Sequence, residues 1–289
     1  MTTNTTGEPE SERARKQREN QEKRHLETLA QIAQALEGNT AARVALALQT
    51  GRAITYHNSG KIEGIFSLDT ACSNNDFCPR MQATESPEVI CKYCYTRNLW
   101  DSATRAHHIT GEILSQVEFT AEEAALVLVP GLTVRYNSDG EIINLTHAIN
   151  LLRIAATHPA ATFTIWTKRP AILDQAIRQE GKPANLICGV SSPMINTPFK
   201  EIWSWADFVF TVYTPRGMAE ALARGEIECN GRKCMECGFH CYRTHRSESA
   251  GPVYVAEALR KPGEISAKTW PDVIASIDAA TLDRQPVEA

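Results

Sequence analysis

The sequence has few aromatic residues and no strong excess of charge of either sign. Aromatic residues make up 7% of the 289 positions, and 30 Lys and Arg residues face 34 Asp and Glu residues, which leaves a net charge of −4. A chain with so small a net charge has no global field that attracts a nucleic-acid backbone or an anionic membrane. Nucleic-acid binding is therefore not expected from composition.

The sequence also lacks an uninterrupted apolar run of about 20 residues, the length that a helix needs to cross a bilayer. Its first residues, MTTNTTGEPESERARKQRENQEKRH, contain no apolar signal-peptide segment. We therefore expect a cytoplasmic protein with no membrane partner. Thiols stay reduced in that compartment, where clustered cysteines bind metal more often than they form disulfides.

The cysteines have an uneven distribution. Eight of the nine form two groups of four, and the ninth, Cys188, lies in an apolar stretch that favours a buried position. The first group is Cys72, Cys78, Cys91 and Cys94, and the second is Cys229, Cys234, Cys237 and Cys241. Disulfide pairing would leave one cysteine over. Each group is therefore a candidate metal site with four thiolate ligands.

The two groups differ in spacing. The second is compact, C-x4-C-x2-C-x3-C, and short spacers let backbone N–H groups turn toward cluster sulfurs, which favours an iron–sulfur cluster. Zinc held by four cysteines is the structural alternative, although zinc ribbons usually separate their two pairs by about a dozen residues or more. The first group, C-x5-C-x12-C-x2-C, is looser, and its spacing alone does not choose between iron and zinc.

The rest of the sequence predicts an α/β fold. Residues 1–25 are charged and predict a disordered or solvated helical tail, and 26–51 predict a pair of helices. Over 52–225 strands alternate with helices, which favours a partial or complete (β/α) barrel over an open doubly wound sheet. Residues 226–250 hold the second cysteine group, and 251–289 predict a closing strand and helix.

In such a fold, chemistry collects at the carboxyl ends of the strands. A predicted strand at 65–68 leads into Cys72, and one at 132–136 leads into the segment 137–141. A third, at 161–166, leads into Thr167-Lys168-Arg169. The first cysteine group is therefore expected on the functional face, as a catalytic cluster would be.

The residues around Cys94 carry a family resemblance. With Tyr93 before it, the pair Cys91 and Cys94 resembles the second half of the radical S-adenosylmethionine (SAM) signature, C-x3-C-x-aromatic-C. This resemblance implies a radical-SAM-like barrel in which three cysteines hold a [4Fe–4S] cluster and one iron is open for SAM. The segment after the next strand resembles that superfamily's Gly-Gly-Glu motif. The SAM-binding residues implied are Ser138, Asp139, Gly140 and Glu141, with Lys168 or Arg135 pairing with the SAM carboxylate.

A closer resemblance is to an uncharacterised, mostly phage-borne cysteine-rich family known only by its gene-product number, eighty-eight. Its members share a cysteine group ending in Cys-Tyr, here Cys94-Tyr95, and a strand of the form Arg-x-(His/Asn)-Ser-(Asp/Gly), here Arg135–Asp139. They also share an aromatic-Thr-(Lys/Arg) step, here Trp166–Arg169, and a compact cysteine group near the C-terminus. The resemblance covers about residues 60–245.

The chain departs from the radical SAM pattern in the spacing of its first group. The superfamily's first cysteine lies four positions before the second, whereas Cys78 and Cys72 lie 13 and 19 positions before Cys91. If all four cysteines hold one cluster, no iron is open for SAM. If Cys72 or Cys78 is left out, three ligands remain and SAM has a site.

These features predict an iron–sulfur enzyme, a radical-SAM-like oxidoreductase or transferase, with two [4Fe–4S] clusters and SAM as cofactors. A reductant such as ferredoxin or flavodoxin is the expected partner, and the substrate is a small molecule or a peptide. Two alternatives stay open. One is a SAM-independent redox or electron-transfer protein with two closed clusters. The other is a zinc-stapled nucleic-acid-binding module, suggested by basic residues such as Arg232 and Lys233 beside the second group.

Overall fold

The computed structural model describes ten stretches of the chain. They are residues 54–72, 75–94, 112–127, 129, 133–200, 202–229, 231–237, 241–242, 251–263 and 265–282. The predicted tail (1–25) and helical pair (26–51) lie outside these stretches. All eight clustered cysteines lie inside them.

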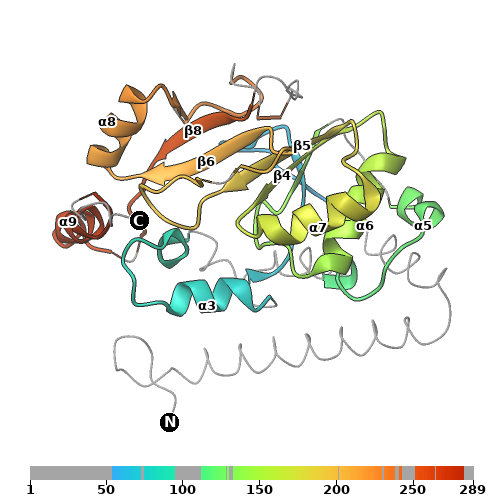
Figure 1. The fold of residues 1–289 in the computed structure, drawn as a ribbon, viewed down its shortest axis with the longest axis horizontal. Coiled ribbons are helices and arrows are strands. Elements are labelled where there is room, and N and C mark those ends of the chain that lie inside the picture. The colour runs from blue at the N-terminus through green and yellow to red at the C-terminus, as the bar shows by residue number, and fades with distance from the viewer. Residues whose placement is uncertain are drawn as a thin grey trace, which may run out of the picture.

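A sheet of eight strands organises the described part of the chain (Figure 1). The strands are β1 (Thr55–Tyr56), β2 (Phe66–Leu68), β3 (Thr133–Tyr136), β4 (Thr162–Thr167), β5 (Leu186–Ser191), β6 (Phe208–Tyr213), β7 (Ile227–Glu228) and β8 (Val253–Ala258). Their spatial order is β1-β2-β3-β4-β5-β6-β8-β7. Only the β1–β2 pair is antiparallel, and the other neighbours are parallel. The predicted α/β class is confirmed, but the described strands form an open sheet and not a closed barrel.

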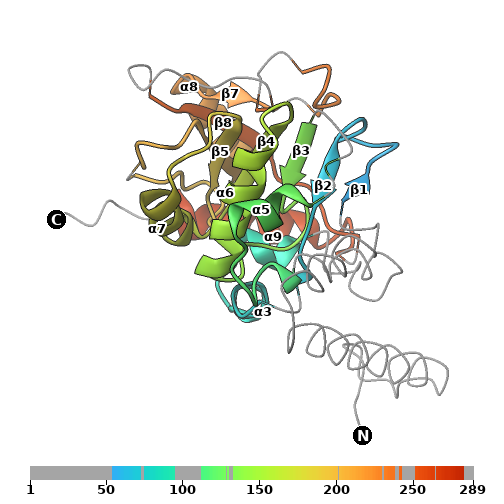
Figure 2. The same cartoon turned by 90° about the vertical axis from the view of Figure 1, so that its right-hand side faces the viewer.

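One face of the sheet carries four helices. The helices are α5 (Ala121–Ala125), α6 (Leu145–Thr157), α7 (Pro170–Glu180) and α8 (Pro215–Ala223). The main core lies between this face and α5, α6 and α7, and it includes Tyr136, Phe163 and Leu173. Successive parallel strands joined by right-handed crossovers place their connecting helices on the same side of the sheet. The order of β2 to β6 follows the chain, as this arrangement requires, and Figure 2 shows β2 to β5 side by side in this order.

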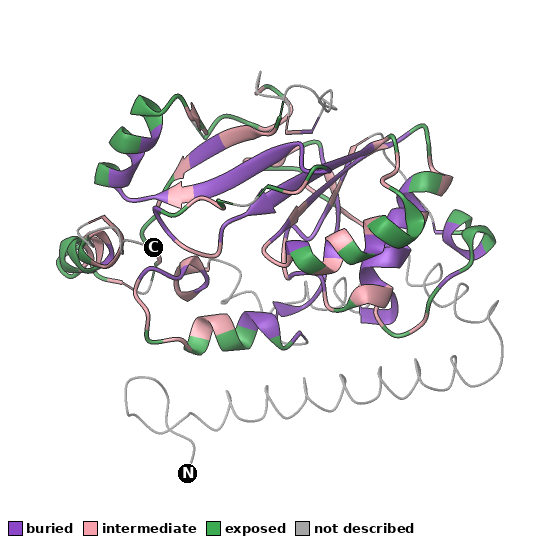
Figure 3. Cartoon of the chain, viewed as in Figure 1, coloured by how far each residue is buried: buried purple, intermediate pink, exposed green. Residues whose placement is uncertain are grey.

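The local sequence explains where these elements begin and how deep they lie. Thr120 forms a capping box at the start of α5, since its hydroxyl accepts from Glu123 N and the Glu123 carboxylate accepts from Thr120 N at 2.9 Å. Asn144 caps α6, and proline opens both α7 and α8. Strand β5 is buried along its whole length (Figure 3), as a nearly continuous apolar run in a central parallel strand should be.

The opposite face of the sheet has a second, smaller core. It contains Ile187, Phe208, Phe210 and Val255, with Trp166 packed against them. Three further helices complete the described structure: α3 (Phe77–Ala83), the 3₁₀ helix η2 (Ile90–Tyr93) and α9 (Trp270–Thr281). Among the described residues, no helix combines the length and the apolar character needed to span a membrane.

Candidate metal centres

The first cysteine group is assembled beyond the carboxyl end of β2. Cys72 follows β2, Cys78 lies in α3, Cys91 lies in η2, and Cys94 ends that 3₁₀ turn. Cys72, Cys78 and Cys91 belong to one buried cluster. The fold therefore packs together cysteines that are up to 19 positions apart in the sequence.

The ends of β4 and β5 hold this group in place. After β5, the backbone of residues 193–195 exchanges two hydrogen bonds with that of residues 88–90, at 2.7 and 2.9 Å. After β4, the Arg169 guanidinium lies 5.7 Å from the centroid of the Phe77 ring at the start of α3. The turn that carries Cys91 and the helix that carries Cys78 are thus both fixed to the strand ends.

Lys168 places a positive charge beside the first group. Burial opposes the charge on its ammonium, but the attraction of Cys91 and Glu141 outweighs burial, so the pKa of Lys168 is raised. Burial also raises the pKa of the Cys91 thiol to about 11, and Lys168 offsets only part of this effect. A bound metal would reverse that balance, because a coordinating thiol is deprotonated.

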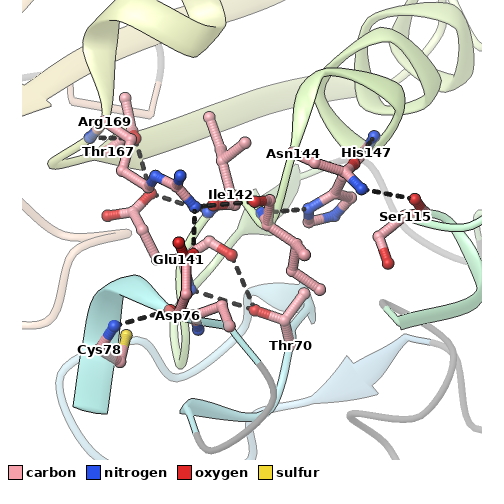
Figure 4. A network of polar contacts seen from close by, with 12 residues as sticks. Thr70, Asp76, Cys78, Ser115, Glu141, Ile142, Asn144, His147, Thr167 and Arg169 are labelled. Atoms are coloured by element: carbon pink, nitrogen blue, oxygen red, sulfur yellow. Dashed lines mark hydrogen bonds and ion pairs between the residues drawn. The ribbon is translucent and has the colours of Figure 1, made fainter. Parts of the chain in front are cut away.

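Glu141 joins the ends of β3 and β4, where its side chain points toward Thr167 (Figure 4). One carboxylate oxygen accepts from the Thr167 hydroxyl at 2.6 Å and from Ile142 N at 2.9 Å. The other accepts from Lys168 N at 2.7 Å. The Thr70 hydroxyl, beyond the end of β2, donates to Glu141 O at 3.0 Å and accepts from Glu141 N at 3.1 Å. Glu141 therefore fixes three neighbouring strand ends relative to one another.

Asp69 is a strand-end carboxylate that sequence reasoning missed. It accepts from the Ser67 hydroxyl at 2.5 Å, from Ser138 N at 2.6 Å and from Asp139 N at 3.1 Å. Ser67 Oγ lies 2.7 Å from Nε2 of His57. Burial and the charge of Asp139 raise the pKa of Asp69, while its hydrogen bonds oppose the shift. The only signal in the sequence is its place directly after a predicted strand.

The predicted segment Ser138–Glu141 packs tightly against the end of β2. The Ser138 hydroxyl donates to Asp69 at 2.8 Å. Gly140 has a φ of +77°, and a Cβ at that position would lie 2.2 Å from the Thr70 carbonyl oxygen. Only glycine allows the chain to come so close with this backbone conformation.

The second cysteine group lies on the sheet face opposite α6 and α7. Cys229 N donates to a carbonyl of β8 at 2.7 Å, and Cys234 N donates to Lys61 O at 2.7 Å. The Thr164 hydroxyl of β4 donates to Cys241 O at 3.3 Å. Cys229 and Cys241 also pack against the smaller core on this face. The group is thus attached to the sheet at several points.

The thiols of the second group interact electrostatically with one another. Burial raises the pKa of Cys241 to about 12, and the three other cysteines of the group add to this shift. Burial likewise raises the pKa of Cys234, where Lys61 and Arg135 act in the opposite direction. Nearby cations favour the thiolate form, which is the form that binds metal.

The donor chemistry at both places fits a thiolate-bound metal centre. As the side chains stand, no set of three or more His, Cys, Asp or Glu residues within the described ranges is arranged to hold a metal ion. Each place nevertheless gathers four cysteines, the ligand type of iron–sulfur clusters and of structural zinc. Each also has a lysine within electrostatic reach of the thiols, Lys168 at the first group and Lys61 at the second.

The structure separates two residues that the radical SAM resemblance groups together. Lys168 lies beside the first cysteine group, within electrostatic reach of Glu141. Arg135 instead lies on the face that carries the second group. Its guanidinium is 4.4 Å from the centroid of the Trp166 ring and donates to the Tyr242 hydroxyl at 3.2 Å.

Comparison with known proteins gives one match. A family model described as Gene product 88 matches residues 33–237, which is more than half of the 289 residues. No curated protein and no solved structure matches the chain. The matched region includes all of the first cysteine group and three cysteines of the second. The chain therefore belongs to the Gene product 88 family.

Proposed function

We propose that this chain is an iron–sulfur protein with two four-cysteine clusters, of which the first is the reactive centre and the second is accessory. The observation that carries the proposal is the position of the first group. Its cysteines gather where the parallel strands end, beside the half-buried Lys168. The carboxyl edge of a parallel sheet is where α/β proteins place their ligand sites.

The proposed ligands are the eight clustered cysteines. Cys72, Cys78, Cys91 and Cys94 would hold the first cluster, and Cys229, Cys234, Cys237 and Cys241 the second. Such clusters supply one-electron transfer. The chain's own contribution is charge balance and rigidity. Lys168 offsets the negative charge of the first thiolate set, and Glu141 fixes the strand end that carries this lysine.

A finer form of the proposal is a radical-SAM-like reaction on a partial (β/α) barrel. Its support is the chain-order sequence of strands β2 to β6, with Cys72 after the first of them and Glu141 after the second. The Glu141 carboxylate already accepts three hydrogen bonds from within the chain. The ammonium group of SAM would therefore be a fourth hydrogen-bond donor to this carboxylate.

Anaerobic purification and reconstitution test the proposal. We expect a brown protein with absorbance near about 400 nm that dithionite bleaches. SAM and dithionite are then added together. Formation of 5′-deoxyadenosine supports the radical form, and its absence with an EPR signal that ignores SAM leaves a SAM-independent redox protein. A colourless anaerobic protein with about two zinc ions per chain would overturn the iron–sulfur proposal.

The nucleic-acid alternative draws less support from the described residues. Of the basic residues that suggested it, Lys233 forms an ion pair with Glu63 at 2.9 Å. This pairing neutralises part of the positive charge beside the second cysteine group.

A further inference from the structure

Helix α9 lies against the turn that carries part of the first cysteine group (Figure 1). Its first residue, Trp270, meets the Tyr93 ring edge-on, with 6.0 Å between the two ring centroids. Tyr93 stands in the sequence between Cys91 and Cys94, at the end of the 3₁₀ turn η2. One end of α9 therefore rests on the segment that supplies two of the candidate ligands.

A second contact of α9 lies two turns further along the helix. Asp278 accepts from the Thr214 hydroxyl at 2.5 Å and from Asn196 Nδ2 at 3.2 Å. The Thr281 hydroxyl accepts from the same Nδ2 at 2.8 Å. Thr214 follows β6 and caps α8, so the Asp278 carboxylate also lies at the amino end of that helix, where a negative charge is stabilised. Asp278, Thr281, Asn196 and Thr214 are called the latch below.

The half of the latch that belongs to the sheet is held in place without α9. Asn196 N donates to Val212 O of β6 at 2.9 Å, and Asn196 Oδ1 accepts from Thr214 N at 2.9 Å. The same loop, at residues 193–195, exchanges backbone hydrogen bonds with residues 88–90, which lead into η2. One loop after β5 thus holds both the latch and the segment that enters the first cysteine group.

Helix α9 has little buried apolar surface to fix it to the protein. Ile277 is its one buried residue, whereas α6 buries eight. In contrast to α6 and α7, which pack along each other, α9 makes only sparse contact with any other described helix or strand. Packing of an apolar face is what stabilises most helices in proteins, and elements with few buried contacts open locally. The contacts at Trp270 and in the latch therefore carry much of the attachment of α9.

The Thr214 hydroxyl has a second acceptor within reach when α9 leaves. Its oxygen lies 2.5 Å from Asp278 Oδ1 and 3.2 Å from Asn196 Oδ1. Once the carboxylate has moved away, the hydroxyl can donate to Asn196 instead, and water can take the place of α9 at Asn196 Nδ2. Leaving a buried polar group unpaired is the main cost of breaking such a contact, and this opening avoids it. The latch therefore has two arrangements in which its buried groups are paired.

We propose that α9 is a lid on the first cysteine group, held shut by the latch and by the contact between Trp270 and Tyr93. The lid opens when α9 swings away from η2 and from the end of β6, while the sheet and its other helices stay in place. Opening uncovers Tyr93 and gives reagents access to Cys91 and Cys94. The use of this access by a substrate or a reductant rests on the proposed function, but the motion itself needs no metal.

Hydrogen exchange measured by mass spectrometry on the full-length chain tests the motion. We expect the amides of α9 to exchange at least about a hundredfold faster than those of α6, through an opening that low urea concentrations do not promote. Asp278→Ala removes the acceptor of the latch, so exchange in α9 should rise about tenfold or more, with α6 unchanged. Asp272→Ala is the matched control, because Asp272 is an exposed carboxylate on the same helix. Its effect on α9 should stay below about threefold.

Alkylation tests whether the lid guards the first cysteine group. The reduced, metal-free full-length chain is treated with iodoacetamide, and peptide mass spectrometry follows the labelling of each cysteine. Labelling through a fast opening tracks the population of the open form, so Asp278→Ala should raise the rates at Cys91 and Cys94 about fivefold or more. Cys234 and Cys237 of the second group are the internal reference, and their rates should not change.

Two results would overturn the lid. One is exchange in α9 that occurs only with unfolding of the whole protein, at the same rate as in α6. The other is labelling of the first group that Asp278→Ala leaves unchanged, or that rises equally in the second group, as a general loss of stability would cause. Iron analysis separates this inference from the proposed function. A chain with a moving α9 and no iron contradicts only the iron–sulfur proposal, and a chain with full iron and a fixed α9 contradicts only the lid.

Discussion

Glu141 and Asp69 are buried carboxylates whose hydrogen bonds tie strand ends together. Glu141 accepts from Thr167, Ile142 and Lys168, and Asp69 accepts from Ser67 and from the backbone of 138–139. Each hydrogen bond to a charged group stabilises more than a neutral one. Both residues therefore position the loops that carry the first cysteine group, whatever that group binds.

Replacing Glu141 tests this role at a single residue. In Glu141→Gln one acceptor oxygen becomes an NH₂ group, which cannot accept from the donors around it. We expect the free energy of unfolding in urea, measured on metal-free protein, to fall by about 2–3 kcal/mol. Thr167→Val removes only one of the three hydrogen bonds and should cost about 1 kcal/mol. Equal stability of Glu141→Gln and the wild type would contradict the role.

His147 gives a prediction about pH. Burial lowers its pKa from 6.5 to about 3, and its Nδ1 accepts from Ile143 N at 3.1 Å. Between pH 6.5, the pKa of the histidine in the unfolded chain, and about pH 3, the unfolded chain binds a proton at His147 that the folded chain does not. The stability due to His147 is therefore complete above pH 6.5 and is lost progressively as pH falls toward 3.

Unfolding experiments over a series of pH values measure this effect. Between about pH 6 and pH 4, His147 should contribute about 1.4 kcal/mol per pH unit to the slope of stability against pH. His147→Asn keeps an acceptor near Ile143 but does not titrate, so its slope should be smaller by that amount. Identical slopes for the two proteins would show that His147 is protonated in the folded state.

Among the elements, the loop from β3 to α6 is constrained by close contact with the end of β2. Gly140 combines a φ of +77° with a Cβ position 2.2 Å from Thr70 O. Gly60 has a similar φ, +81°, but open space around its Cβ position. Substitution at Gly60 therefore measures the effect of backbone conformation alone, whereas substitution at Gly140 adds the effect of a steric clash.

Alanine substitution at these glycines distinguishes the two effects. Gly60→Ala should cost about 1–2 kcal/mol, the cost of a left-handed backbone for a residue with a Cβ. Gly140→Ala should cost more than about 3 kcal/mol, because the strand-end contact must also open. Thermal unfolding monitored by circular dichroism measures both. Equal Tm values for the two variants would mean that the loop does not rest on β2.

The elements that were predictable from sequence are those with local signals. The strand predicted at 161–166 is Thr162–Thr167, because an apolar run depends only on neighbouring residues. The strands β1 and β7 were not predicted, since each has only two residues, too few for a period-two pattern. Helix α3 was also missed, although the Asn75 side chain accepts from Cys78 N at 2.7 Å at its start, because the helix has only seven residues.

The same distinction holds for the candidate site. Cysteine spacing indicated the two groups, and the structure packs Cys72, Cys78 and Cys91 together. The role of Asp69 could not be predicted. A sequence does not show which buried polar groups meet across strands and which are left without a partner.

In the molecule as a whole, the two cysteine groups occupy different parts of the sheet. The first lies beyond the carboxyl ends of the strands, and the second covers the face opposite α6 and α7. Strand β4 reaches both, since Trp166, Cys229 and Cys241 pack against the same smaller core while Lys168 lies beside Cys91. The two groups should therefore be separable by mutation, each surviving loss of the other.

Iron and sulfide analysis with Mössbauer spectroscopy on anaerobically reconstituted variants tests the central claim most directly. We expect about eight iron atoms per wild-type chain, and about four in each double variant, Cys91→Ala/Cys94→Ala and Cys234→Ala/Cys237→Ala. Cys188→Ala is the matched control, because Cys188 is buried in the main core away from both groups, and it should keep all the iron. Wild-type protein that binds zinc and no iron, or double variants that keep the full iron content, would contradict the account.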